Sequence, residues 1–137
     1  MPMSSNLTGD DKVYDSLLHQ AETILFQRLA RYLVLDKDIF GEPGWDILLC
    51  AFIAHRKGVA CTSEGVASTI GLGLATTKRW INLLVERKML TSQNGIFTIA
   101  DETEQKISRM FQAQINEIRK SASIELRRHM EATRRQS

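Results

Sequence analysis

The sequence predicts one mainly α-helical unit that carries a small β-hairpin. Apolar residues recur every three or four positions along most of the 137-residue chain, and Asn94-Gly95 separates two short β-prone runs. A composition of 43% hydrophobic and 25% charged residues excludes wholesale disorder. The longest apolar run, residues 47–54, is far shorter than the roughly 20 residues of a membrane span.

An amphipathic helix is expected over residues 10–36, where no glycine or proline interrupts the apolar periodicity. The glycines and proline of residues 41–44 then break the chain. A second helix is expected over Trp45–Arg56, and because it is apolar on nearly every side it belongs at the centre of the core. It ends at Gly58, and Val59–Cys61 is expected to form a brief strand.

A short third helix is expected to be capped by Thr62 or Ser63 and to end at Ser68 or Ile70. A tight turn that contains two glycines leads into a fourth helix, over about Leu74–Lys88. These two helices and their turn have the order of a helix-turn-helix.

Two short strands, Met89–Ser92 and Ile96–Ile99, are expected next, joined by a turn at Gln93-Asn94-Gly95. Asp101 has the position of an N-cap, with Glu104 three residues later. The long helix that follows is expected to reach Ala132. It is longer than a domain of this size needs, so its apolar stripe is expected to be buried on a partner.

The order of elements suggests a winged helix-turn-helix between two terminal helices. Two stretches of sequence carry a resemblance to a known family of proteins, residues 40–49 (FGEPGWDILL) and residues 76–90 (TTKRWINLLVERKML). The segment from Phe40 to Phe111 resembles the MarR family of bacterial transcription regulators. The resemblance implies dimerisation helices at 1–38 and 101–137 around a DNA-binding core at 39–100, all in one folded unit. It also implies a homodimer on a near-palindromic double-stranded DNA site, with a small aromatic molecule as a candidate effector. Independently of the resemblance, Cys50 and Cys61 form no CxxC motif and no disulfide framework, which indicates a reducing, cytoplasmic compartment.

The fourth helix has the residue types that major-groove recognition requires. Residues 51–100 hold six Lys or Arg against two Asp or Glu, a local excess of positive charge. Arginine can bind guanine and asparagine can bind adenine through two hydrogen bonds each. Ile81 and Leu84 are expected to hold the opposite face on the core, with Thr77 and Trp80 as further candidates for that face. The expected DNA contacts in this helix are Thr76, Thr77, Lys78, Arg79 and Asn82.

The hairpin departs from the family pattern, in which an arginine near the tip enters the minor groove. Here the tip, residues 92–95, contains no Lys or Arg, and Gln93 and Asn94 are the expected contacts. Basic residues elsewhere are candidates to compensate. An alternative hypothesis is a winged helix that binds another protein instead of DNA. The compensating candidates are Arg56, Lys57, Arg87 and Lys88.

Other chemistries have weak support in the sequence. There is no metal-ligand spacing, phosphate-binding loop or nucleophile–base set, so neither an enzyme nor a cofactor is expected. Cys50 is expected to be an inert core thiol, whereas Cys61 precedes a helix start, which favours a thiolate, so a redox role for it stays open. Aromatic residues near the second helix could line an effector cleft or simply fill the core. These residues are Tyr32, Phe40, Trp45 and Phe52.

Overall fold

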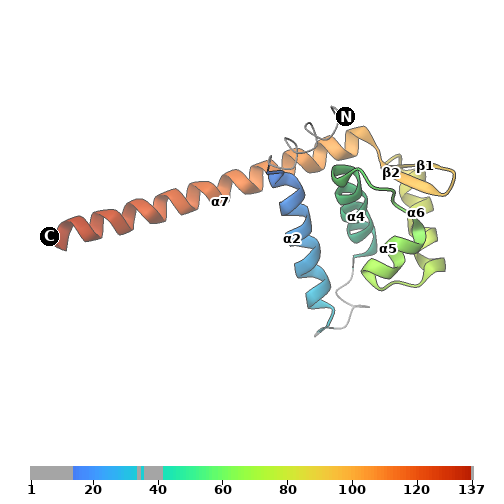
Figure 1. Ribbon diagram of the computed structural model, residues 1–137, viewed down its shortest axis with the longest axis horizontal. Helices are drawn as coiled ribbons and strands as arrows, with labels where there is room; N and C mark the ends of the chain where they lie inside the picture. The colour runs from blue at the N-terminus through green and yellow to red at the C-terminus, as the bar shows by residue number, and fades with distance from the viewer. Residues whose placement is uncertain (1–13, 34, 36–41, 137) are drawn as a thin grey trace, which may run out of the picture.

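The computed structural model describes residues 14–33, 35 and 42–136 (Figure 1). Within these ranges the chain is mainly helical, with one two-stranded antiparallel hairpin and a long C-terminal helix, which confirms the mainly α class. The elements are α2 (Ser16–Arg31), α4 (Pro43–Lys57), α5 (Ser63–Ile70), α6 (Leu74–Glu86), β1 (Leu90–Gln93), β2 (Ile96–Ile99) and α7 (Asp101–Gln136).

The first described helix is shorter than predicted. α2 begins at Ser16 because the side chain of Asp15 caps it, with Oδ1 accepting the N–H of Leu18 at 3.0 Å. It ends at Arg31, five residues before the predicted end. Residues 10–13, 34 and 36 of the predicted helix lie outside the described part of the chain.

The second described helix begins two residues earlier than predicted. α4 starts at Pro43, because proline is favoured in the first turn, where its missing N–H has no helical acceptor. It ends at Lys57, since Gly58 has a left-handed conformation with φ of +67° and closes the C-terminus.

The helix pair α5–α6 agrees closely with the prediction. Thr62 caps α5, and its Oγ1 accepts the N–H of Gly65 at 3.1 Å. Gly71, with φ of +68°, turns the chain toward α6. α6 stops at Glu86 and not at the predicted Lys88, because Lys88 has a φ of +62° that no α-helix continues through.

The hairpin forms as predicted, but its turn has two residues and not the predicted three, because Gln93 belongs to β1. Gln93 pairs with Ile96, and Asn94 and Gly95 between them both have positive φ, as a type I′ turn requires. β1 begins at Leu90, one residue after the predicted start.

The strand expected at Val59–Cys61 does not form. The chain there makes one isolated bridge, between Thr62 and Ile96, and the Cys61 carbonyl accepts the N–H of Phe97 at 3.0 Å. One bridge joins the segment to the edge of the hairpin, because the chain turns directly into α5.

α7 begins one residue earlier than an N-cap at Asp101 would place it. The carbonyl of Ala100 accepts the N–H of Glu104 at 2.9 Å, so Asp101 is already helical, and the N-cap prediction is wrong. The Glu104 carboxylate bonds Arg56 and Ser108, each at 3.0 Å. At 36 residues α7 is about 54 Å long, and most of it extends away from the other elements (Figure 1).

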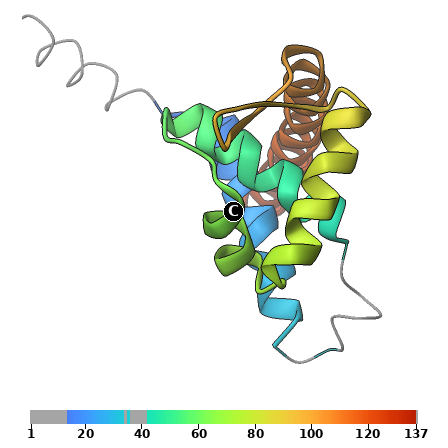
Figure 2. The same ribbon diagram turned by 90° about the vertical axis from the view of Figure 1, so that its right-hand side faces the viewer.

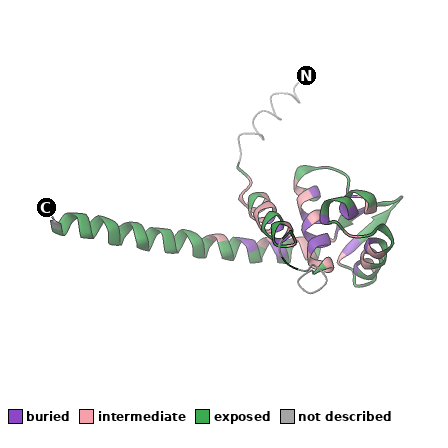
Figure 3. Cartoon of the chain, turned by 90° about the horizontal axis from the view of Figure 1, so that it is seen from below, coloured by how far each residue is buried: buried purple, intermediate pink, exposed green. Residues whose placement is uncertain are grey.

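The core surrounds α4, as its all-round apolarity predicted. Ile47, Leu49 and Phe52 of α4 are fully buried, and Phe111 of α7 packs edge-on against Phe52 with ring centroids 5.3 Å apart. Figure 3 shows that the buried residues of α7 are confined to its first part. α7 is therefore anchored at one end, and within the described part of the chain its residues 116–135 are exposed.

A buried polar cluster joins α2 to α4. Arg28 of α2 is 8% exposed, and its Nε donates to Asp46 of α4, which is 1% exposed. The Tyr32 hydroxyl donates to the same carboxylate at 2.8 Å, and Glu42 lies 3.7 Å from the guanidinium. Burial lowers the pKa of Arg28 while Asp46 raises it, and the net pKa is above its ordinary value. Arg28 therefore stays charged inside the protein.

Candidate nucleic-acid interface

One face of α6 is open to solvent and the other is in the core. Thr77, Ile81 and Leu84 are buried, whereas Lys78, Arg79 and Asn82 are exposed. α6 and the hairpin lie at one end of the molecule, and the C-terminal end of α7 lies at the other (Figure 1). In the view from the α6 end, α7 extends away behind them (Figure 2). Three of the predicted contact residues thus share one accessible surface.

Thr77 is not available to DNA, which corrects its predicted role. Its side chain is fully buried, and its hydroxyl donates to the carbonyl of Gly73 at 2.9 Å. Thr76 is half-buried, and its hydroxyl accepts a hydrogen bond of 3.2 Å from Arg79. Thr76 therefore has a second role, because it holds the Arg79 guanidinium beside the first turn of the helix.

The N-terminus of α6 suits an anion. Its N-cap is Gly73, which contributes no side-chain hydrogen bond, and its first turn contains no acidic residue. Each of the other described helices has a capping side chain or an acid there. Uncapped N–H groups and the positive end of the helix dipole favour a phosphate.

The two sequence stretches that carry the family resemblance meet at Gly44 and Trp80. A Cβ atom on Gly44 would lie 3.4 Å from the ring of Trp80, an ordinary van der Waals distance, so the start of α4 packs directly beside α6. Gly44 lies between Glu42 and Asp46, which both bind Arg28, so this contact is next to the buried cluster. Neither link was predicted from the sequence; an aspartate within an otherwise apolar helix was the available signal.

The hairpin tip exposes both predicted polar residues. Gln93 and Asn94 are exposed, but they lie on the hairpin, on a different element from α6. Neither β1 nor β2 nor the turn between them contains a Lys or Arg. The surface of the hairpin is thus uncharged.

Two of the four compensating cations are already paired. Arg56 binds Glu104 at 3.0 Å and lies 3.7 Å from Asp15, and its guanidinium covers the Phe52 ring. Lys57 binds Glu22 at 3.0 Å. These two residues connect α4 to α7 and α2. Arg87 and Lys88 are exposed just beyond the end of α6.

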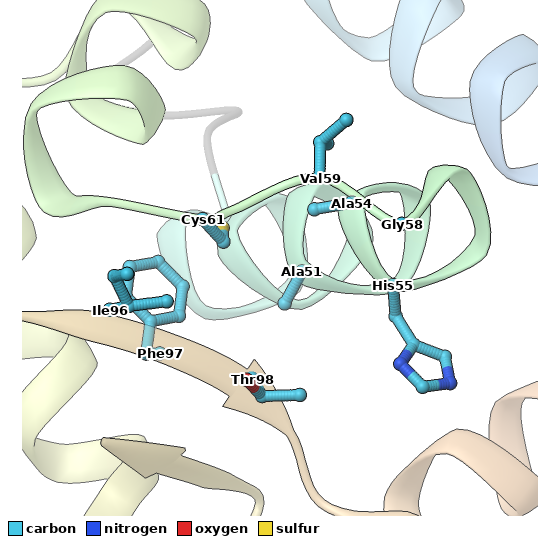
Figure 4. A pocket seen from close by; sticks show the side chains of 9 residues that line it. All are labelled: Ala51, Ala54, His55, Gly58, Val59, Cys61, Ile96, Phe97 and Thr98. Atoms are coloured by element: carbon cyan, nitrogen blue, oxygen red, sulfur yellow. The ribbon is translucent and has the colours of Figure 1, made fainter. Parts of the chain in front are cut away.

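Three of the four aromatic residues that could line an effector cleft or fill the core are packed against neighbouring side chains. Phe52 is fully buried, and the rings of Trp45 and Phe111 pack with their centroids 6.3 Å apart. The Tyr32 hydroxyl donates a hydrogen bond to Asp46. Phe40 lies outside the described residues. A small hollow of about 130 Å³ lies instead between α4 and β2, where side chains of the two elements face each other (Figure 4). It is below the usual range of small-molecule sites.

Both cysteines are protonated thiols. Burial raises the pKa of Cys50 to about 12 and that of Cys61 to about 11. The expectation that the helix start favours a Cys61 thiolate is wrong, because desolvation of the charged form outweighs it. A thiol in this state is a poor target for oxidants.

We expect both thiols to react slowly with iodoacetamide at pH 8 until the protein unfolds. Roughly one free thiol in ten is ionised at that pH, against about one in a thousand for Cys61 in the folded protein. Mass spectrometry after timed alkylation, with and without denaturant, measures the two rates, and equal rates would contradict the burial. Because both pKa values are raised, these groups also lower the stability as the pH rises above 9.

Among the residues that the structure describes, no three His, Cys, Asp or Glu side chains gather as a metal site would require. Within the same residues, no helix has the length and apolar character to cross a membrane. Compared with known proteins, the chain matches no family model, no characterised relative and no solved structure.

Proposed function

We propose that this protein is a homodimeric, sequence-specific DNA-binding regulator of transcription. In this proposal α5 and α6 form a helix-turn-helix, α6 lies in the major groove, and the β1–β2 hairpin is the wing. The observation that carries it is the division of α6 into a buried apolar face and an open face with Lys78, Arg79 and Asn82. An α-helix fits the major groove, and these side chains match its donors and acceptors.

Each open side chain of α6 has a distinct role in the proposal. Arg79, oriented by Thr76, reads guanine through two hydrogen bonds, and Asn82, one turn later, reads adenine. Lys78 binds a phosphate, and the uncapped N-terminus of α6 binds another. Specificity therefore depends on two residues of one helix.

The uncharged hairpin limits the affinity. Without a cation at the tip, Gln93 and Asn94 contribute neutral hydrogen bonds, and the electrostatic contribution comes from α6 and from Arg87 and Lys88 beyond it. A protein-binding module is the second candidate. It is favoured by Leu74 and Leu83, which are 41% and 37% exposed on α6.

Replacing Arg79 by alanine is expected to weaken binding to a preferred duplex by about 1–3 kcal/mol and to relax its sequence preference. The duplex is first selected from a random-sequence pool with the native protein. Fluorescence anisotropy on the selected and scrambled duplexes, over a series of salt concentrations, then gives the affinity and the preference.

The matched control is Arg127→Ala, which removes the same charge from an exposed position on α7, far from α6 in the fold. It is expected to leave the preference unchanged. Equal effects of the two variants would place the contact face elsewhere than on α6. If no duplex is enriched and the protein does not bind DNA even at low salt, the protein-binding candidate replaces the proposal.

A further inference from the structure

One face of α7 carries an apolar stripe that begins in the core and continues onto the exposed part of the helix, residues 116–135. At its start Ile107 and Phe111 are buried in the protein's own core, and Ile115 is half-buried. Farther along the same face, Ile118 and Leu126 are each 61% exposed. Exposed apolar side chains in a row on one helix face indicate a surface that another element covers.

The residues before and after Ala122 match in a way that suits antiparallel pairing of two identical helices. The residues four positions before and after it, Ile118 and Leu126, are both apolar. The residues three positions before and after it, Arg119 and Glu125, have opposite charges. The charge of the whole helix follows the same pattern. Residues 101–118 hold two Lys or Arg against four Asp or Glu, whereas residues 119–136 hold six against two.

We infer that α7 pairs with α7 of a second copy of this chain in antiparallel orientation, with the two-fold axis at Ala122. The inference rests on the homodimer of the proposed function and specifies its interface. Antiparallel pairing places Ile118 opposite the partner's Leu126, and Arg119 level with the partner's Glu125. Both relations occur twice, because a two-fold interface is self-complementary.

A parallel pair would not use this pattern. It would place Arg119 beside the partner's Arg119 and the basic C-terminal ends of α7 side by side, where like charges repel. In the antiparallel pair the basic end of each helix points toward the acidic half of the other. Charge complementarity therefore selects the orientation.

In the proposed pair the two helices overlap along only part of their length, on either side of the crossing point at Ala122. The protein's own core covers this face of α7 as far as Phe111, so a partner helix cannot lie along its full length. The small residues Ser121, Ala122 and Ser123 allow close approach at the crossing point.

A hollow of about 330 Å³ lies next to the crossing, where the start of α2 meets α7. It is lined on the α7 side by Ile115 and Ile118 and on the α2 side by Tyr14 and His19. We assign this hollow to the partner's Leu126 and Met130. In the isolated chain those two side chains are 61% and 56% exposed.

Disulfide formation between single cysteine substitutions tests the orientation in the full chain. Ala122→Cys lies on the two-fold axis and is expected to form a covalent dimer under mild oxidation. Ile118→Cys and Leu126→Cys are expected to form none on their own, because identical residues four positions from the axis are about 12 Å apart along the helix. A disulfide requires Cα atoms within about 7 Å.

An equal mixture of the Ile118→Cys and Leu126→Cys chains, combined under reducing conditions before oxidation, is expected to yield the mixed dimer. The native chain is the control for Cys50 and Cys61, which are buried or half-buried. A covalent dimer of Ile118→Cys alone would show a parallel pair and overturn the inference. Failure of Ala122→Cys to form a dimer would overturn it as well.

A charge exchange tests the same register without new cysteines. Arg119→Glu is expected to raise the dissociation constant of the dimer about tenfold in sedimentation experiments. Each Glu125 then faces one like charge, and this repulsive pair occurs twice per dimer. Adding Glu125→Arg to Arg119→Glu is expected to restore the native dissociation constant. The matched control is Lys120→Glu, which reverses a charge on the opposite face of α7; an equal loss there, or no rescue, would contradict the register.

Neither experiment involves DNA, so its failure is distinguishable from failure of the proposed function. A chain that forms the predicted disulfides but selects no duplex would overturn the proposed DNA binding and support the interface. A chain that binds a duplex through Arg79 but sediments as a monomer would overturn the interface and leave DNA binding intact.

Discussion

Replacing Phe111 by alanine is expected to lower the free energy of unfolding by about 3–5 kcal/mol. Phe111 is fully buried, and its ring centroid lies 5.3 Å from that of Phe52, which it meets edge-on, and 6.3 Å from that of Trp45. Its loss leaves a cavity between α4 and α7 and removes two aromatic contacts. Since α7 is anchored through its first part, the same change is expected to loosen the helix from the core.

Chemical denaturation followed by circular dichroism measures this loss. Phe111→Leu is the conservative variant, which fills most of the volume and is expected to cost less than the alanine change. Met110→Ala is the matched control, because its side chain is adjacent in sequence but 40% exposed. A loss at Phe111 no larger than at Met110 would show that Phe111 does not anchor α7.

Replacing Asp46 by alanine is expected to destabilise the protein by a similar 3–5 kcal/mol. Asp46 is 1% exposed and accepts hydrogen bonds from both Arg28 and Tyr32. Without it, a guanidinium that is 8% exposed keeps its charge with no buried counter-ion. The nearest remaining acid, Glu42, is 3.7 Å away and its side chain is 66% exposed, so it compensates weakly.

Two further variants separate the charge from the packing. Glu42→Ala is expected to cost about 0–1 kcal/mol, as an exposed partner does. Arg28→Met combined with Asp46→Leu removes both buried charges and is expected to recover most of the loss of Asp46→Ala. If the double variant is as unstable as Asp46→Ala alone, the loss is not due to the unpaired arginine.

The sequence was most informative where structure depends on neighbouring residues. The hairpin follows from Asn94-Gly95, because the turn needs two positive φ angles. The cap at Thr62 follows from a local hydrogen bond in the same way. α7 was also predictable, since a long apolar stripe at helical spacing has no local alternative. Local signals failed at Asp101, because the carboxylate of Glu104 binds Arg56 of a distant helix and does not return to the helix start.

Within the candidate site, the sequence indicated the helix and its buried face at Ile81 and Leu84, but it left the side on which Thr77 lies open. Lys78, Arg79 and Asn82 are exposed together, as predicted from the polar positions of this helix. Thr77 belongs to the same run of polar residues, yet it is buried, because its hydroxyl bonds Gly73 within the helix and needs no solvent. Composition does not distinguish such a threonine from an exposed one.

The sequence by itself determined the mainly helical class, the order of the elements, the hairpin at Asn94-Gly95 and the polar character of α6. These depend on periodicity, capping and φ preferences, which act over a few residues. Only the tertiary structure decided that Asp46 neutralises Arg28, that Gly44 packs beside Trp80, and that burial raises the pKa of Cys61. Those properties depend on which distant side chains meet and on how much water they exclude, and no local pattern in the chain encodes either.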